Sequence, residues 1–489
     1  MLPALILKVF ILYTLILFFI SWLTSRKSTN KTYFLGNRQS PWPVVAYGMI
    51  GASLSGVTFI SVPGWVGDSN FTYMMVVFGY ILGYATITFV LLPLYYRLNL
   101  VSIYTYLGQR FGSYSHKTGA FYFILSRLIG ASFRMFLVIN VLQIFIFDAL
   151  GIPFYFSVIF FILLITLYTY RGGIKTIVWT DMLQTTFMLS ALVVTIYIVL
   201  DHMGLTFGQL LSKVHEAGFT QMIETDWRHD RFFLKQFLSG MFITIVMTGL
   251  DQDMMQKNLS CKSLKEAQKN MFSLGILLVP VNLLFMFLGA SLYVYATDFG
   301  ISLPTLSDDL FPMLAIHHFG AVAAVIFFVG LIAAAYSSAD GAITALTTSV
   351  TFDLLGYDSN EKKDETQLKK SRYKIHFFIS LLIVFIIVLF REINDQAVIA
   401  RLFTIAGYTY GPLLGLFAFG LYTRRHVLDK AVPIVAFISP LLSYLLSQYS
   451  VELLWGYKFG FEILIVNGFF TFIGLMLIQK KQHISTTTN

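Results

Sequence analysis

Two adjacent serines, Ser337 and Ser338, lie within a long apolar stretch that reads AAAYSSADGAITALTT. Ala334, Ser337 and Ser338 are spaced i, i+3 and i+4, so they share one face of a helix. Hard cations take oxygen ligands, and an ion that must leave again is held by groups that bind it only moderately. Two hydroxyls and a carbonyl of this helix could supply half of such a shell. Asp340, one turn after Ser337, could hold a second cation or a proton.

A second apolar stretch carries residues that weaken a helix near its middle. Glycine and hydroxyl residues crowd this segment, and they are Gly48, Gly51, Ser53, Ser55, Gly56 and Thr58. A later stretch repeats the pattern with Ser239, Gly240, Thr244, Thr248 and Gly249. In a membrane, a broken helix is tolerated where its backbone lines a cavity, and paired breaks indicate a transporter binding site. Small residues also permit tight helix packing, which is the structural alternative.

Charged residues inside apolar stretches form a third signal. These residues are Arg127, Arg134, Asp181, Asp251, Asp253, Asp340 and Arg401. A charge at mid-membrane costs about 2.5–3.5 kcal/mol on insertion scales, so such residues are usually functional or paired. Asp251 and Asp253 lie near a span end and could instead reach headgroup water. For Asp340 and Arg134, which lie deep, the sequence favours a function or a mutual ion pair.

The composition sets the elements that must position these residues. The chain has 489 residues, of which 57% are hydrophobic and 12% charged, and its mean hydropathy is +0.73. A soluble domain carries about 25% charged residues, so a soluble enzyme is excluded. The single cysteine, Cys261, permits no internal disulfide. The net charge of +9 is explained by basic cytoplasmic loops, and no nucleic-acid partner is expected.

A transmembrane helix needs about 20 apolar residues, and by this length the sequence predicts an all-α integral membrane protein with about thirteen transmembrane helices. The predicted spans are 3–23, 41–66, 71–96, 118–149, 152–170, 176–200, 232–255, 270–297, 318–350, 373–391, 398–421, 430–449 and 459–479. Basic residues gather in alternate loops, among them Arg97, Arg110, Lys117, Arg171, Lys175, Lys257, Lys262, Lys265 and Lys269. These loops should be cytoplasmic, which places the N-terminus outside and the C-terminus inside the cell.

Six stretches resemble the sodium/solute symporter family, in the family order and over nearly the whole chain. They are LSGVTFISVPG (54–64), VSIYTYLGQRFG (101–112), YRGGIKTIVWTDMLQ (170–184), LDQDMMQKNLSCKS (250–263), AAAYSSADGAITALTT (333–348) and AGYTYGPLLGLFAFGLY (406–422). The resemblance implies one transporter domain, 1–489, with the LeuT-type inverted-repeat fold. One span (3–23) would precede the first repeat of five (41–200) and the second repeat (232–421), and two more spans (430–479) would follow.

The resemblance also implies where the sodium ion (Na+) binds. The main site would use the backbone carbonyls of Gly51, Leu54 and Ala334 and the hydroxyls of Ser337 and Ser338. A second site, present in part of the family, matches Ser53, Asp181, Ser337, Asp340 and Gly341. Glycine at 341 removes a hydroxyl from that second site, whereas Asp340 adds a carboxylate, so this position is expected to hold either a second ion or a proton.

The substrate would sit between the broken helices. Ser55, Thr58 and Arg134 match positions that contact substrate in the sialic acid transporters of this family, and Arg134 suits a carboxylate. Val77 stands where those transporters carry glutamine, which argues against sialic acid itself. Tyr73, Phe78, Gln252 and Tyr408 are candidate wall or gate residues.

The resulting hypothesis is a sodium-coupled symporter in the cell membrane. It would import a small polar solute, a sugar acid, sugar or carboxylate, by alternating access. A proton-coupled transporter and a sodium-coupled importer of a proline-like amino acid are the alternatives. The expected partners are the solute, sodium and the lipid bilayer, with the monomer as the functional unit. No spacing of residues favours an enzyme.

Overall fold

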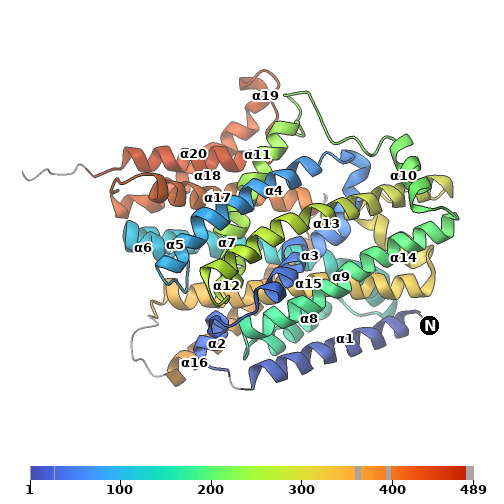
Figure 1. Ribbon diagram of the computed structural model, residues 1–489, viewed down its shortest axis with the longest axis horizontal. Coiled ribbons are helices and arrows are strands. Elements are labelled where there is room, and N and C mark those ends of the chain that lie inside the picture. Colours follow the sequence, from blue (N-terminus) through green and yellow to red (C-terminus); the bar gives the residue numbers. More distant parts are fainter. Residues whose placement is uncertain (1, 27, 358–364, 393–397, 481–489) are drawn as a thin grey trace, which may run out of the picture.

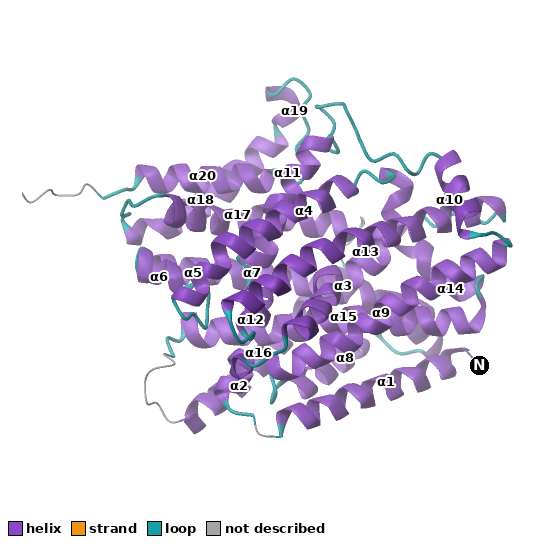
Figure 2. Cartoon of the chain, viewed as in Figure 1, coloured by secondary structure: helices purple, strands orange, loops and turns teal. Residues whose placement is uncertain are grey.

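The protein is described by a computed structural model, which covers residues 2–26, 28–357, 365–392 and 398–480. Within these residues the regular secondary structure is helical throughout (Figure 2). A helix pairs its own backbone N–H and C=O groups, which have no water partner in hydrocarbon. The all-α architecture predicted from the composition is therefore confirmed.

Each of the thirteen predicted spans corresponds to a helix or to a run of consecutive helices. They are α1 (Leu2–Ser25), α3 (Trp42–Ser69), α4 (Met74–Thr86) with η2 (Ile87–Leu91) and α5 (Leu92–Arg97), α7 (Ser113–Leu142) with η3 (Gln143–Phe147) and η4 (Asp148–Leu150), α8 (Phe154–Thr169), α9 (Ile174–Met203), α11 (Phe233–Thr244) with η5 (Ile245–Gly249) and α12 (Gln252–Leu259), α13 (Leu264–Asp298), α15 (Gly320–Ser349) with η7 (Val350–Leu354), α16 (Glu365–Arg391), α17 (Val398–Tyr422), α18 (Val432–Gln448) and α20 (Ile463–Leu477).

The lengths of these helices differ from the uniform 20 or so residues assumed for each span. Among the described residues, ten helices are long and apolar enough to cross a membrane, and the bent pair formed by 233–249 and 252–259 makes an eleventh. The helices α8 and α20 have 16 and 15 residues and are apolar. They are shorter than the predicted segments 152–170 and 459–479, because Pro153 precedes α8 and a turn at 461–462 precedes α20.

The helices pack around α3 and α15, which lie in the middle of the molecule (Figure 1). The helix α3 contacts α9, α13 and α15, while α4 packs on α11 and α17 packs on α7 and α20. The N-terminus and the last residues of α20 lie at opposite ends of the helices (Figure 1), as an odd number of spans requires. The limits of the two repeats, 41–200 and 232–421, stay a prediction.

Short helices connect the spans. They are α2 (Asn30–Leu35), η1 (Gly36–Arg38), α6 (Thr105–Arg110), α10 (Phe207–Glu216), η6 (Ser307–Asp309), α14 (Leu310–His317), η8 (Asp429–Ala431) and α19 (Ser450–Leu453). Cys261, in the turn between α12 and α13, is free and buried, and burial raises its thiol pKa to about 12. The thiol therefore stays protonated and unreactive at physiological pH.

Candidate functional site

The helix α3 is broken at Ser55. This residue has φ 60° and ψ 178°, whereas the rest of Trp42–Ser69 is helical. A helix that ends leaves its last four carbonyls without partners within the helix, and here those are the carbonyls of residues 51–54. The break predicted from the glycine and hydroxyl residues of this segment is confirmed, and it falls at the residue that follows the proposed carbonyl ligands.

The second predicted break lies between α11 and α12. The two segments Phe233–Gly249 and Gln252–Leu259 meet at an angle of 64°. Asp251 caps the new helix, since its carboxylate accepts hydrogen bonds from the backbone N–H groups of Asp253 (2.9 Å) and Met254 (3.2 Å). A carboxylate at a helix N-terminus satisfies free donors and matches the helix dipole. The pattern Thr248-Gly249 therefore marked a true break.

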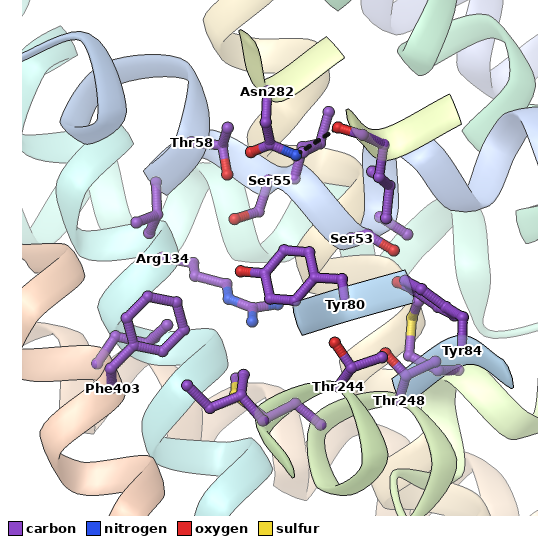
Figure 3. A pocket seen from close by; sticks show the side chains of 18 of the residues that line it. Ser53, Ser55, Thr58, Tyr80, Tyr84, Arg134, Thr244, Thr248, Asn282 and Phe403 are labelled. Carbon is purple, nitrogen blue, oxygen red and sulfur yellow. Dashed lines mark hydrogen bonds between the residues drawn. The ribbon is translucent and has the colours of Figure 1, made fainter. Parts of the chain in front are cut away.

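A cavity with about 720 Å³ of empty space lies against the broken part of α3. Its wall comes from α3, α4, α7, α11 with η5, α12, α13 and α17 (Figure 3). Six residues predicted from the sequence line it, and they are Ser53, Leu54, Ser55, Thr58, Tyr73 and Arg134.

Three other predicted wall residues are not among the lining residues. Gln252 is buried and joins α12 to the segment that precedes α6. Its side-chain amide donates to the Val101 carbonyl (2.8 Å) and accepts from the Ile103 N–H (3.0 Å). The ring of Tyr408 lies 6.0 Å from that of Tyr444 on α18. Phe78 is half-buried on α4 and packs against the hydrophobic core. The sequence pattern gave no means to separate these packing positions from wall positions.

The cavity also contains polar residues that were not predicted to line it. They are Tyr80, Tyr84, Thr244, Thr248 and Asn282. The hydroxyls of Tyr73 and Tyr80 lie 2.8 Å apart, and the Asn282 amide donates to the Leu278 carbonyl at 2.7 Å (Figure 3). A signal was available for Asn282, which is an isolated amide in an apolar span, and for Tyr80 and Tyr84, which share a helix face.

Two cations, Arg127 and Arg134, line this cavity. The Arg134 side chain points toward Tyr80 (Figure 3) and is 8% exposed. Among the described residues it forms no ion pair, and its Nε has no hydrogen-bond partner. The neighbouring Arg127 takes the acidic partners instead, since it pairs with Asp253 and lies 3.7 Å from Asp251. The suggested structural pair of Arg134 with an intramembrane aspartate is absent from the part of the chain that the structure describes.

Two of the residues predicted for the main sodium site, Gly51 and Ser337, lie against α9. The Gly51 N–H donates to Thr185 Oγ1 at 3.1 Å, and a Cβ on Gly51 would lie 2.4 Å from that oxygen. From the other side, Ser337 of α15 lies beside Asp181. The Ser337 hydroxyl is fully buried and has no hydrogen-bond partner in the described chain. Ser338 donates to the Ala334 carbonyl at 3.2 Å. The absence of a side chain at Gly51 thus permits close packing of α3 on α9.

The candidates for a second ion lie in two places, the cavity wall and the contact between α9 and α15. Ser53 is a wall residue of the cavity. Asp181 lies 2.8 Å from the ammonium of Lys257. Asp340 accepts hydrogen bonds from Tyr168 (2.8 Å), Thr180 (3.5 Å) and its neighbour's backbone N–H.

Two expectations about charges are corrected. Lys257, predicted in a cytoplasmic loop, lies on α12 and is 1% exposed. Asp251 and Asp253 do not reach headgroup water, because both are fully buried beside Arg127. The bend at 249–252 turns α12 back into the protein, which a linear count of apolar residues cannot show. The side chain of Arg401 lies outside the described residues.

Comparisons with known proteins agree with this geometry. The model of the sodium:solute symporter family matches residues 33–431. A sodium/sialic acid symporter of Proteus mirabilis is 24% identical over 456 residues, which cover 88% of this chain and 87% of the relative. A sodium/sialic acid symporter of Aliivibrio fischeri is 23% identical, over 85% of this chain and 83% of the relative. A sodium/glucose cotransporter of Vibrio parahaemolyticus is 26% identical, over 59% of this chain and 55% of the relative.

Two solved structures show the fold. The substrate-bound, outward-open state of a sodium-coupled sialic acid symporter matches with a TM-score of 0.84 and 19% identity, over 98% of this chain and 99% of that one. A transporter of the nucleobase-cation-symport-1 family in a closed conformation matches with a TM-score of 0.58 and 15% identity, over 92% and 94%. The LeuT-type fold expected from the sequence is confirmed.

Proposed function

The chain belongs to the sodium:solute symporter family, and on that premise we propose that it imports a small anionic solute of the sugar-acid class together with sodium. Arg134 carries this proposal. A buried guanidinium without an acidic partner is costly unless a ligand supplies the negative charge. Its planar fork is matched by a carboxylate, which it can bind through two parallel hydrogen bonds.

The rest of the cavity suits a solute with hydroxyl groups. Ser55, Thr58, Thr244 and Thr248 present hydroxyls from opposite walls, and Tyr80 presents a phenol (Figure 3). Two relatives that match most of the chain are symporters of sialic acid, an acidic sugar. Val77 in place of glutamine leads us to propose the class of sugar acids, and not sialic acid in particular.

The coupling ion is sodium, and its main site is formed by the carbonyls of Gly51, Leu54 and Ala334 with the hydroxyls of Ser337 and Ser338. Two observations support this assignment. The break at Ser55 frees the carbonyls that precede it, and Ser337 keeps a buried hydroxyl without a partner in the described chain. Sodium would join α3 to α15, and substrate and sodium would each raise the affinity for the other by the same factor.

The protein acts in the cell membrane, with the N-terminus outside and the C-terminus in the cytoplasm. The short helices α2 and α6, whose neighbouring loops carry basic residues, lie at the same end of the molecule as the last residues of α20 (Figure 1). Basic loops face the cytoplasm. We further propose that one copy of the chain is sufficient for transport, because the cavity and the sodium ligands all come from a single chain.

A panel of solutes tests the substrate class. Purified protein is heated with sugar acids, other monocarboxylates, neutral sugars and neutral amino acids, each with sodium or with choline. We expect stabilisation by a sugar acid only in sodium, since binding to the folded state raises the melting temperature. Stabilisation that needs no sodium would favour the proton-coupled alternative, and a neutral amino acid as the sole hit would favour the amino acid importer.

Arg134→Gln tests the role of the guanidinium. Loss of a charge-assisted hydrogen bond costs about 1.5–3 kcal/mol. The KM for the anionic solute that stabilises the protein in the panel should therefore rise by about 10- to 100-fold. Arg134→Lys keeps the charge without the fork and should give a smaller increase. Both variants should keep the stabilisation by sodium alone. An unchanged KM in Arg134→Gln would contradict the proposed site.

Ser338→Ala tests the sodium site. Removal of one ligand should raise the sodium concentration for half-maximal uptake by about tenfold or more. Ser443→Ala on α18 is the matched control, because Ser443 is also a buried helical serine that donates to the carbonyl four residues earlier. Equal sodium dependence in the two variants would show that Ser338 is not a ligand.

A further inference from the structure

Six charged side chains are buried together where α7, α9, α12 and α15 meet. Four are carboxylates, namely Asp181, Asp251, Asp253 and Asp340, and two are cations, Arg127 and Lys257; each of the six is at most 4% exposed. Arg127 serves the pair on the bend, since it contacts Asp251 and Asp253. Asp251 is also bonded by the Tyr410 hydroxyl at 2.8 Å. Lys257 is therefore the cation available to the aspartates of α9 and α15.

The Lys257 ammonium lies between carboxylates of two helices. It is 2.8 Å from Asp181 Oδ2 of α9 and 3.5 Å from Asp253 Oδ1, one turn earlier on its own helix. Gly341 of α15 makes this position possible, because a Cβ there would lie 2.4 Å from Asp253 Oδ1. The absence of a side chain at 341 lets α12 approach α15 and carry Lys257 to Asp181.

The surroundings of Asp181 are those of a cation site. Its Oδ1 accepts no hydrogen bond within the described chain, and the Ser337 hydroxyl beside it has no partner there either. Both groups are buried. A desolvated carboxylate requires a positive charge close by. The one that the structure provides is the ammonium of Lys257.

We propose that the Lys257 ammonium takes the place of a second sodium ion at Asp181. This inference rests on the proposed function. A tethered ammonium supplies the positive charge that Asp181 needs, and its like charge repels a free cation from the same oxygens. Because the lysine cannot leave with the solute, the site is filled permanently and contributes nothing to transport. The protein then couples one sodium ion, held by the main site, to each solute molecule.

Equilibrium binding of radioactive sodium to the purified full-length protein tests the proposal. The wild type should bind one ion per chain. Lys257→Met keeps the length of the side chain without its charge, and it should bind two ions, because sodium fills the vacated position. Lys257→Arg keeps a cation and should bind one. Asp181→Asn combined with Lys257→Met removes both charges and should also return to one.

The outcomes separate this inference from the proposed function. Two ions in the wild type would overturn the role of Lys257 and leave sodium coupling intact. No sodium in the wild type would overturn the proposed function itself. One ion in folded Lys257→Met, with Ser338 unchanged, would also overturn the inference, since the vacated position would then not accept sodium. If Lys257→Met does not fold, the wild-type count decides between one ion and two.

Discussion

Gly341 shows how a single residue sets the position of a buried charge. A Cβ at this position would lie 2.4 Å from Asp253 Oδ1, and Asp253 is held in place by Arg127 and Lys257. Gly341→Ala should therefore lower the free energy of unfolding by about 1–3 kcal/mol, the usual cost of overpacking. Denaturation of the purified protein in detergent measures this change.

A glycine with space around it provides the control for Gly341. Gly130, in the middle of α7, has Leu402 Cδ1 as its nearest neighbour, at 4.0 Å from a built Cβ. Gly130→Ala should leave stability unchanged or raise it slightly, since alanine favours a helix more than glycine does. If Gly341→Ala proves as stable as Gly130→Ala, the carboxylate of Asp253 is not fixed as described.

At single residues, the resemblance to the symporter family identified part of the cavity wall. Ser55, Thr58 and Arg134 were predicted as substrate residues, and all three line the cavity. Lys257 was misplaced, because its partner Asp181 lies 76 positions earlier in the chain and the bend before α12 brings them together. A hydropathy pattern contains no information on such a pair, so a lysine near a span end is assigned to the nearest loop.

The break in α3 is the central feature at the scale of elements. Ser55 has φ 60° and ψ 178°, a region that non-glycine residues occupy at a cost of about 1–3 kcal/mol. We expect Ser55→Gly to be more stable than Ser55→Ala by about 1 kcal/mol, because only glycine adopts this conformation freely. Both variants lack the hydroxyl, so thermal unfolding of the two isolates the backbone.

The comparison of the two Ser55 variants also has an outcome that contradicts the break. An alanine variant more stable than the glycine variant would be the usual order within a continuous helix. Sodium should be absent from the measurement, since a bound ion would add its own stabilisation to either variant. A second run with sodium then shows whether the unwound carbonyls still bind it.

At the same scale, the sequence predicted which helices break but not how far the broken parts turn. Glycine and hydroxyl residues marked both breaks, because these residue types weaken a helix wherever they occur. The segments α11 and α12 meet at 64°, and after the bend Asp251 and Asp253 pair with Arg127 of α7. That pairing belongs to the packed protein, which explains why Asp251 and Asp253 were given a possible place at the membrane surface.

At the scale of the whole molecule, the charge carried per cycle follows from the number of ions. One sodium ion with a singly charged anion transfers no net charge, so the membrane potential does no work on the cycle. A second sodium ion would add one charge, worth about 2.3 kcal/mol at 100 mV. The accumulation of the solute in the one-ion case is limited by the sodium concentration ratio alone.

Proteoliposomes with a fixed sodium gradient and an imposed potassium diffusion potential measure this property. The anionic solute that stabilises the protein in the panel should reach the same steady-state accumulation at zero potential and at 100 mV, inside negative. A second sodium ion would instead raise it by about 50-fold at 100 mV, since each 1.4 kcal/mol is a factor of ten. Lys257→Met, if it transports, should show that dependence on the potential, whereas Lys257→Arg should not. A wild type that accumulates the anion more strongly under the potential would place an additional cation in the transport cycle, and Asp181 could then not be neutralised by Lys257 alone.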